Sequence, residues 1–82
     1  DEFVIALPNT GHEQALQFAE RLHQSFAEKL SRFSVGASAA TSSVGVTIML
    51  PADGSYEDTL KRADAALYDA KRLGKDRVVF AD

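Results

Sequence analysis

The sequence predicts an α/β fold in which helices pack against a sheet, in the order strand, helix, strand, helix, strand. Short apolar runs rich in β-branched residues alternate with two stretches in which apolar residues recur every three or four positions. No linker or repeat divides the 82 residues, which are 45% hydrophobic and 26% charged. This composition is typical of one small globular unit with a packed core.

The first strand and the first helix follow each other closely. Residues 3–7, Phe-Val-Ile-Ala-Leu, form an apolar run that ends at Pro8 and Asn9, as expected of a buried strand. Thr10 and Glu13 then have the spacing of a capping box, which predicts the start of a long amphipathic helix. Its apolar stripe consists of Ala15, Phe18, Ala19, Leu22, Phe26, Leu30 and Phe33.

The second half of the chain repeats this pattern. We expect a strand over about residues 40–49, a turn over residues 51–54, and a helix that begins at Ser55 and ends with Gly74 as its C-cap. Residues 77–80 form the third apolar run. Three strands and two helices leave sheet edges uncovered, so we expect the chain to be an incomplete part of a larger sheet. The apolar stripe of the second helix consists of Leu60, Ala63, Leu67 and Ala70.

Composition narrows the range of functions. Nine Lys and Arg against twelve Asp and Glu give a net charge of −3, so the surface as a whole offers no footprint for nucleic acid. The chain has no cysteine and therefore no disulfide or thiolate metal site, which favours a cytoplasmic protein. No apolar run approaches the roughly 20 residues that span a bilayer, so we expect no membrane segment here.

Two clusters of charged residues are candidates for chemistry. Asp1 and Glu2 stand where the first strand begins, and paired carboxylates there can hold Mg²⁺. The alternative is that both are solvated terminal acids. Lys71 and Lys75 lie four residues apart across the end of the second helix and could converge on a polyphosphate. The alternative is that these cations only complement the helix dipole.

The two histidines, His12 and His23, lie on or near the first helix without metal-ligand spacing. No nucleophile stands beside them in the sequence, so we expect both to be surface residues.

Three blocks of the sequence resemble one known family. Residues 1–3, Asp-Glu-Phe, match the last three letters of the GGDEF signature, and residues 43–46 match the family's Ser-Ile-Gly-Val strand. Residues 62–78 match its closing block, Arg-Ala-Asp-x-Ala-Leu-Tyr-x-Ala-Lys-x-x-Gly-Arg-Asn-x-Val. Over nearly its whole length, the chain resembles the C-terminal half of a GGDEF domain, the catalytic domain of bacterial diguanylate cyclases.

The resemblance implies a palm-like α+β fold, with helices packed on a mainly antiparallel sheet and residues 1–82 as the C-terminal fragment of one domain. It also implies condensation of two GTP molecules to cyclic di-GMP, with release of pyrophosphate. Two such domains would each hold one GTP and face each other in a homodimer, downstream of a sensor or receiver domain. The isolated fragment should be inactive, because half of the site would be missing.

The resemblance also assigns roles to individual residues. Asp1 would bind the metal, Mg²⁺ or Mn²⁺, and act as base for the attacking 3′-hydroxyl, with Glu2 as the second acid. Lys71 and Lys75 would contact the terminal phosphates.

One departure from the family pattern lies at the proposed phosphate site. Lys75 and Asp76 stand where the family usually has Arg-Asn. Lysine keeps the positive charge but lacks the guanidinium group with which arginine binds phosphate through two hydrogen bonds. Asp76 adds a negative charge. Two alternatives therefore stay open. The chain could belong to a degenerate GGDEF module that binds nucleotide or a protein partner without catalysis, or to an unrelated three-strand interaction domain.

Overall fold

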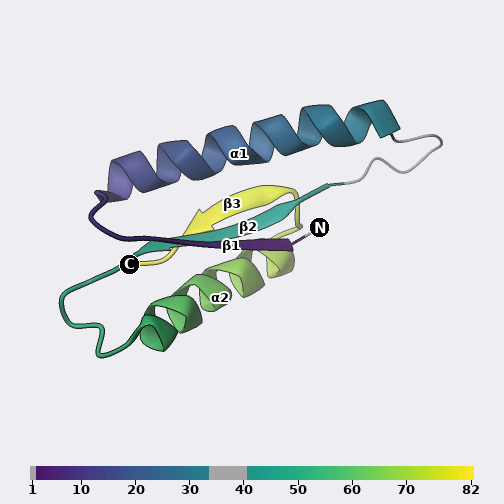
Figure 1. The fold of residues 1–82 in the computed structure, drawn as a ribbon. Helices are drawn as coiled ribbons and strands as arrows, with labels where there is room; N and C mark the ends of the chain where they lie inside the picture. The colour runs from purple at the N-terminus through teal and green to yellow at the C-terminus, as the bar shows by residue number, and fades with distance from the viewer. Residues whose placement is uncertain (1, 34–40) are drawn as a thin grey trace.

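The computed structural model describes residues 2–33 and 41–82, with residues 30–33 described by their backbone alone. The elements follow the predicted order, strand, helix, strand, helix, strand, as Figure 1 shows. They are β1 (Glu2–Leu7), α1 (His12–Phe33), β2 (Ser43–Ile48), α2 (Tyr56–Arg72) and β3 (Arg77–Phe80). Residue 40, where the second strand was expected to begin, lies outside the described residues.

The three strands form one parallel sheet in the order β1-β2-β3. The expectation of a mainly antiparallel sheet is therefore wrong for the described strands. Each helix carries the chain back to the end at which the previous strand began, so the next strand runs in the same direction. In this register Glu2 lies beside Ser43, and Ser43 lies beside Arg77. The amino ends of all three strands consequently share one edge of the sheet.

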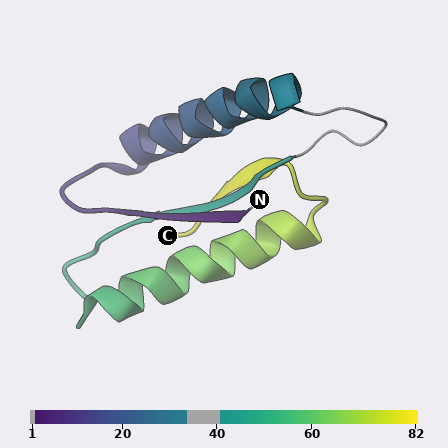
Figure 2. The same cartoon turned by 45° about the vertical axis from the view of Figure 1, so that its right-hand side comes forward.

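The sheet lies between the two helices, as both views of the ribbon show (Figures 1 and 2). Successive residues of a strand point to opposite faces. Val44 and Val46 point to the α1 side, where they form a core with Ala15 and Ala19. Gly45 points to the α2 side. The residues packed around the α1-side core are Phe3, Ile5, Leu7, Leu16, Ile48, Val78 and Phe80.

Helix α1 begins at His12, so the predicted capping box is wrong. The Thr10 hydroxyl donates to the carbonyl oxygen of Pro8 (2.8 Å) instead of accepting from the helix. The first helical hydrogen bond runs from the Ala15 N–H to the Gly11 carbonyl oxygen (2.9 Å).

The apolar stripe of α1 is only partly buried. Ala15 and Ala19 are fully buried against the sheet, whereas Phe18 and Leu22 are exposed. The side chains of Leu30 and Phe33 lie outside the described residues. The predicted stripe is thus wider than the surface that the sheet covers.

Helix α2 packs closely on the sheet, at a distance that larger side chains at the contact would prevent. Its buried residues are small: Thr59, Ala63, Ala66 and Ala70. The helix comes closest at Gly45 of β2, where a Cβ atom would overlap with the backbone of Ala63 and Leu67. The absence of a side chain at Gly45 therefore sets the distance between α2 and the sheet.

The ends of α2 agree with prediction to within one residue. Ser55 is the N-cap, although its side chain makes no capping bond, and the Asp58 carboxylate instead accepts from the Gly54 N–H (3.0 Å). At the other end the C-cap is Leu73, one residue before the predicted Gly74, and Gly74 follows it with φ = +126°, in the left-handed region that favours glycine just after a helix. Within residues 2–33 and 41–82, neither helix is long and apolar enough to cross a membrane.

Candidate active site at the amino ends of the strands

The amino ends of the strands and the carboxyl end of α2 lie at the same edge of the molecule (Figure 1). This follows from the topology, since a helix between parallel strands runs opposite to them. The first described residue, Glu2, and the last turn of α2 are therefore brought together from opposite ends of the chain. The partial negative charge at the carboxyl end of α2 also favours the cations Lys71 and Arg72 there.

Two of the predicted site residues are in direct contact. The Lys71 Nζ donates to Glu2 Oε1 at 3.2 Å, with the two side chains 39% and 57% exposed, respectively. An ion pair this exposed is worth roughly 0–1 kcal/mol, so a phosphate or a metal ion could displace either partner at little cost. Asp1, the other predicted acid, lies outside the described residues.

Lys75 stands in a turn of unusual backbone conformation. Gly74, Lys75 and Asp76 have φ values of +126°, +65° and +48°, so two residues with side chains occupy the left-handed region. The Lys75 N–H donates to the Ala70 carbonyl oxygen (2.9 Å), and the Lys75 carbonyl oxygen accepts from Arg77 Nε (3.0 Å). The Lys75 side chain is exposed and has no ion-pair partner among the described residues.

Of the two carboxylates predicted to hold a metal ion, Asp1 and Glu2, the structure describes Glu2. No three His, Asp or Glu side chains gather into a metal site within the part of the chain that the structure describes. Mg²⁺ often binds proteins through only one or two carboxylates and takes its other ligands from water and substrate phosphates. Glu2 suits this kind of site and could not hold the ion alone.

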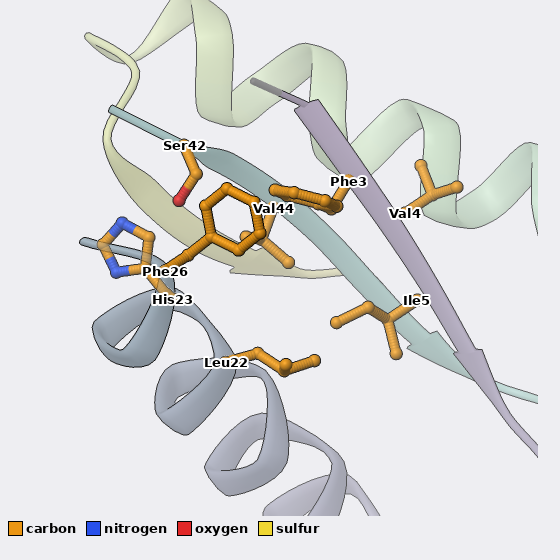
Figure 3. Close-up of a pocket in the computed structure, with 8 residues that line it drawn as sticks. All are labelled: Phe3, Val4, Ile5, Leu22, His23, Phe26, Ser42 and Val44. Atoms are coloured by element: carbon orange, nitrogen blue, oxygen red, sulfur yellow. The ribbon is translucent and has the colours of Figure 1, made fainter. Parts of the chain in front are cut away.

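His23 is not the surface residue that the sequence predicted. Its side chain is only 17% exposed, and it lines a cavity of about 130 Å³ between α1 and the sheet (Figure 3). His12, in contrast, is more than half exposed and stacks on Phe80, with ring centroids 3.8 Å apart. The other residues that line the cavity are Phe3, Val4, Ile5, Leu22, Phe26, Ser42 and Val44.

His23 also joins α1 to the turn that carries Lys75. Its Nε2 lies 3.0 Å from Asp76 Oδ1, and an ionised carboxylate only accepts, so the ring nitrogen is the donor. Sequence reasoning missed this contact, because 53 positions separate the two residues.

A second cluster that the sequence did not reveal ties α2 to the loop after β2. Arg62 donates to both oxygens of Asp53, from Nη1 to Oδ1 at 2.8 Å and from Nη2 to Oδ2 at 2.9 Å. The Asp53 side chain is 8% exposed and that of Arg62 is 19% exposed. Arg62 also donates to the Thr47 hydroxyl (3.0 Å) and to the Ile48 carbonyl oxygen (2.7 Å).

The same carboxylate accepts two further hydrogen bonds, from the Leu50 N–H (2.9 Å) and the Thr59 hydroxyl (2.7 Å). The bonds from Arg62, then from Leu50 and from Thr59, all favour the ionised form and hold the pKa of the Asp53 carboxyl well below its usual value of 3.8. Arg62 therefore pairs across the fold with Asp53 and not with the neighbouring Asp64. We call this cluster the Asp53–Arg62 clamp.

The chain is similar in sequence to known proteins of one family. Residues 1–77 match the family described as "Diguanylate cyclase, GGDEF domain". The chain is 38% identical over 81 residues to Diguanylate cyclase DgcP of Pseudomonas aeruginosa, and 33% identical over 81 residues to Diguanylate cyclase A of Treponema denticola. It is 35% identical over 83 residues to Response regulator PleD of Caulobacter vibrioides.

These alignments cover 99%, 99% and 96% of this chain but only 12%, 22% and 18% of the three relatives. No solved structure matches the chain. The family match covers most of the chain and includes both members of the Glu2–Lys71 pair. The chain therefore belongs to the GGDEF domain family of the diguanylate cyclases.

Proposed function

We propose that residues 1–82 are the C-terminal half of the catalytic domain of a diguanylate cyclase, which condenses two GTP molecules to cyclic di-GMP and releases two pyrophosphates. The observation that carries this proposal is the meeting of Glu2 and Lys71, which lie at opposite ends of the chain and are joined by a 3.2 Å ion pair. Both belong to blocks that resemble the family's signature and closing motif.

The chemistry proposed here requires little covalent participation by the protein. Phosphoryl transfer is accelerated mainly by positioning the reacting groups and by neutralising phosphate charge. In the proposal Lys71 and Lys75 bind the terminal phosphates of GTP, and Lys71 exchanges Glu2 for phosphate when the nucleotide arrives. The exposed Glu2–Lys71 pair is weak enough for this exchange.

The acids act at the other end of the triphosphate. We propose that Asp1 and Glu2 hold Mg²⁺ or Mn²⁺, which supplies charge neutralisation when it is bound. Asp1 also accepts the proton of the attacking 3′-hydroxyl. Catalysis takes place in the cytoplasm, in a homodimer that brings two GTP sites face to face, and an upstream sensor or receiver domain controls it. Residues 1–82 alone do not turn over GTP.

The test uses the protein extended upstream of Asp1 as its gene encodes. It is incubated with GTP and Mg²⁺, and cyclic di-GMP is measured by chromatography. We expect product from the unmodified protein and none from Asp1→Ala. Lys71→Met should lower kcat/KM by at least about tenfold, because a cation that neutralises transferring phosphate is lost. Lys61→Met is the matched control, since Lys61 is exposed on the same helix outside the site.

The outcomes separate the proposal from its alternative. Equal loss of activity in the Lys61 and Lys71 variants would contradict the role of Lys71. If the extended protein bound GTP without forming product, the chain would belong to a degenerate nucleotide-binding module.

A further inference from the structure

The turn that carries Lys75 is held in a conformation that its own residues disfavour. Lys75 and Asp76 both have positive φ, which is uncommon for residues other than glycine and costs energy. Such backbone conformations persist when the surrounding structure fixes them, and they cluster at ligand-binding sites. The question is which contacts fix this turn.

Three sets of contacts hold the turn. Lys75 N–H bonds to Ala70 and Gly74 N–H to Lys71, which anchor the turn to the end of α2. Arg77 Nε donates to the Lys75 carbonyl oxygen. These bonds all lie within the segment from the end of α2 to the start of β3.

The third contact comes from the opposite face of the sheet. His23 of α1 reaches Asp76 at 3.0 Å, and its ring lies beside Phe26 at the wall of the cavity (Figure 3). Because His23 belongs to α1, the contact ties Asp76 to the helix on the opposite face of the sheet and not merely to α2. Asp76 is the residue directly after Lys75.

We propose that His23 and Asp76 are positioning residues for Lys75. They hold the left-handed turn in place so that the Lys75 ammonium stands on the same edge as Lys71, ready to bind phosphate. The hydrogen bond to His23 also gives the Asp76 carboxylate a partner and so reduces its competition for the neighbouring ammonium. The phosphate-binding role of Lys75 rests on the proposed function. The hydrogen bond between His23 and Asp76, which we call the tether, does not.

The first experiment measures the contact between His23 and Asp76 in the protein extended upstream of Asp1, by amide hydrogen exchange. The reporter is the Lys75 N–H, which exchanges only when its bond to Ala70 opens. His23→Phe keeps an aromatic ring in the cavity wall and removes the donor, and should speed this exchange on the order of fivefold. The Met49 N–H, bonded to Leu7 at the other end of the sheet, should be unaffected.

Three further variants control for a merely structural effect. His12→Phe changes the other histidine of α1, which is remote from the turn, and should leave Lys75 exchange unchanged. Asp76→Asn keeps an oxygen that accepts from Nε2 and a residue that tolerates the left-handed conformation, so it should preserve the protection. Asp76→Gly relieves the backbone strain but loses the acceptor, so it should speed exchange as His23→Phe does.

The second experiment asks whether the tether serves phosphate binding. Inorganic tripolyphosphate is titrated into the protein extended upstream of Asp1, and its affinity is measured by calorimetry. His23→Phe should weaken binding about three- to tenfold, and should have no further effect once Lys75→Gln is present, as expected of residues that act together. Additive losses would contradict positioning through Lys75.

The two experiments fail separately. Unchanged Lys75 exchange in His23→Phe would overturn the tether, whatever the phosphate data show. Faster exchange with no tripolyphosphate binding by the unmodified extended protein would leave the tether standing and count against the phosphate role proposed for Lys75.

Discussion

The two faces of the sheet are packed in different ways. On the α2 face, a glycine and a row of small residues allow close approach, and the Asp53–Arg62 clamp locks the helix to the loop after β2. On the α1 face, a partly open pocket of about 130 Å³ lies between the sheet and the helix, and Phe18 and Leu22 of the helix are exposed.

This difference indicates which face of the sheet holds binding residues more firmly in position. Lys71 lies on α2 and Lys75 lies three residues beyond its end, so the cations of the candidate site belong to the tightly packed face. Among the described residues, the contact from the α1 face to that site is made by His23. Accurate placement of a binding residue requires a supporting structure that cannot shift, and the α2 face provides one.

The strongest way to break the close packing is Gly45→Ala. The new Cβ would overlap with the backbone of Ala63 and Leu67, which has no rotamer through which to move away. We expect a loss of at least about 3 kcal/mol in the free energy of unfolding, measured by urea denaturation. Gly11→Ala is the control, because no atom lies within 4 Å of its added Cβ and its effect should be near zero.

Removing the arginine of the clamp should have the next largest effect. Arg62→Met keeps much of the side-chain length but leaves the Asp53 carboxylate largely buried without its charged partner. We expect the melting temperature to fall by on the order of 10 °C. Arg72→Met serves as the comparison, since Arg72 makes only an exposed 3.6 Å pair with Asp69, and should change the melting temperature by about 2 °C or less.

The clamp should also make stability depend on acid pH. The folded-state pKa of Asp53 lies below its usual value of 3.8, so the stabilisation is complete above about pH 5 and is lost as the pH falls toward 2. The difference in urea midpoint between the unmodified chain and Asp53→Asn should therefore become smaller as the pH falls from about 5 toward 2. Asp64→Asn, which removes an exposed carboxylate on α2, is the control and should change the urea midpoint little.

The smallest predicted effect is a gain in stability, and it concerns the α1 face. The Ser42 hydroxyl is buried and has no hydrogen-bond partner within residues 2–33 and 41–82. Ser42→Ala should therefore raise the free energy of unfolding by about 1 kcal/mol, as measured by urea denaturation. An unchanged or lower value would indicate that water in the cavity satisfies the hydroxyl.

Local features of the fold were predictable from the sequence. β3 was placed at residues 77–80, and the end of α2 at Gly74, because apolar runs and cap glycines act over a few residues. The direction of the sheet was not, since the expectation of antiparallel strands came from the family and not from the order of elements. The start of α1 was missed because the Thr10 hydroxyl bonds to Pro8 instead.

The candidate site was predictable in part. Glu2 and Lys71 were both named from sequence, and the structure joins them. The roles of Asp53 and His23 were not visible, because each depends on a partner brought close only by the tertiary fold. A weak signal for Asp53 was available, since Arg62 in the matched closing block requires an acid when it is partly buried.

The parallel sheet has a consequence for synthesis of the chain. Within residues 1–82, β1 is made before its partner β2, which follows only after the whole of α1. At ribosomal speeds of about 5–20 residues per second, the apolar β1 waits roughly 2–8 seconds before its partner exists. During that interval the strand is open to association with other chains, so production of the soluble protein should be sensitive to translation rate and to chaperones that shield extended apolar segments.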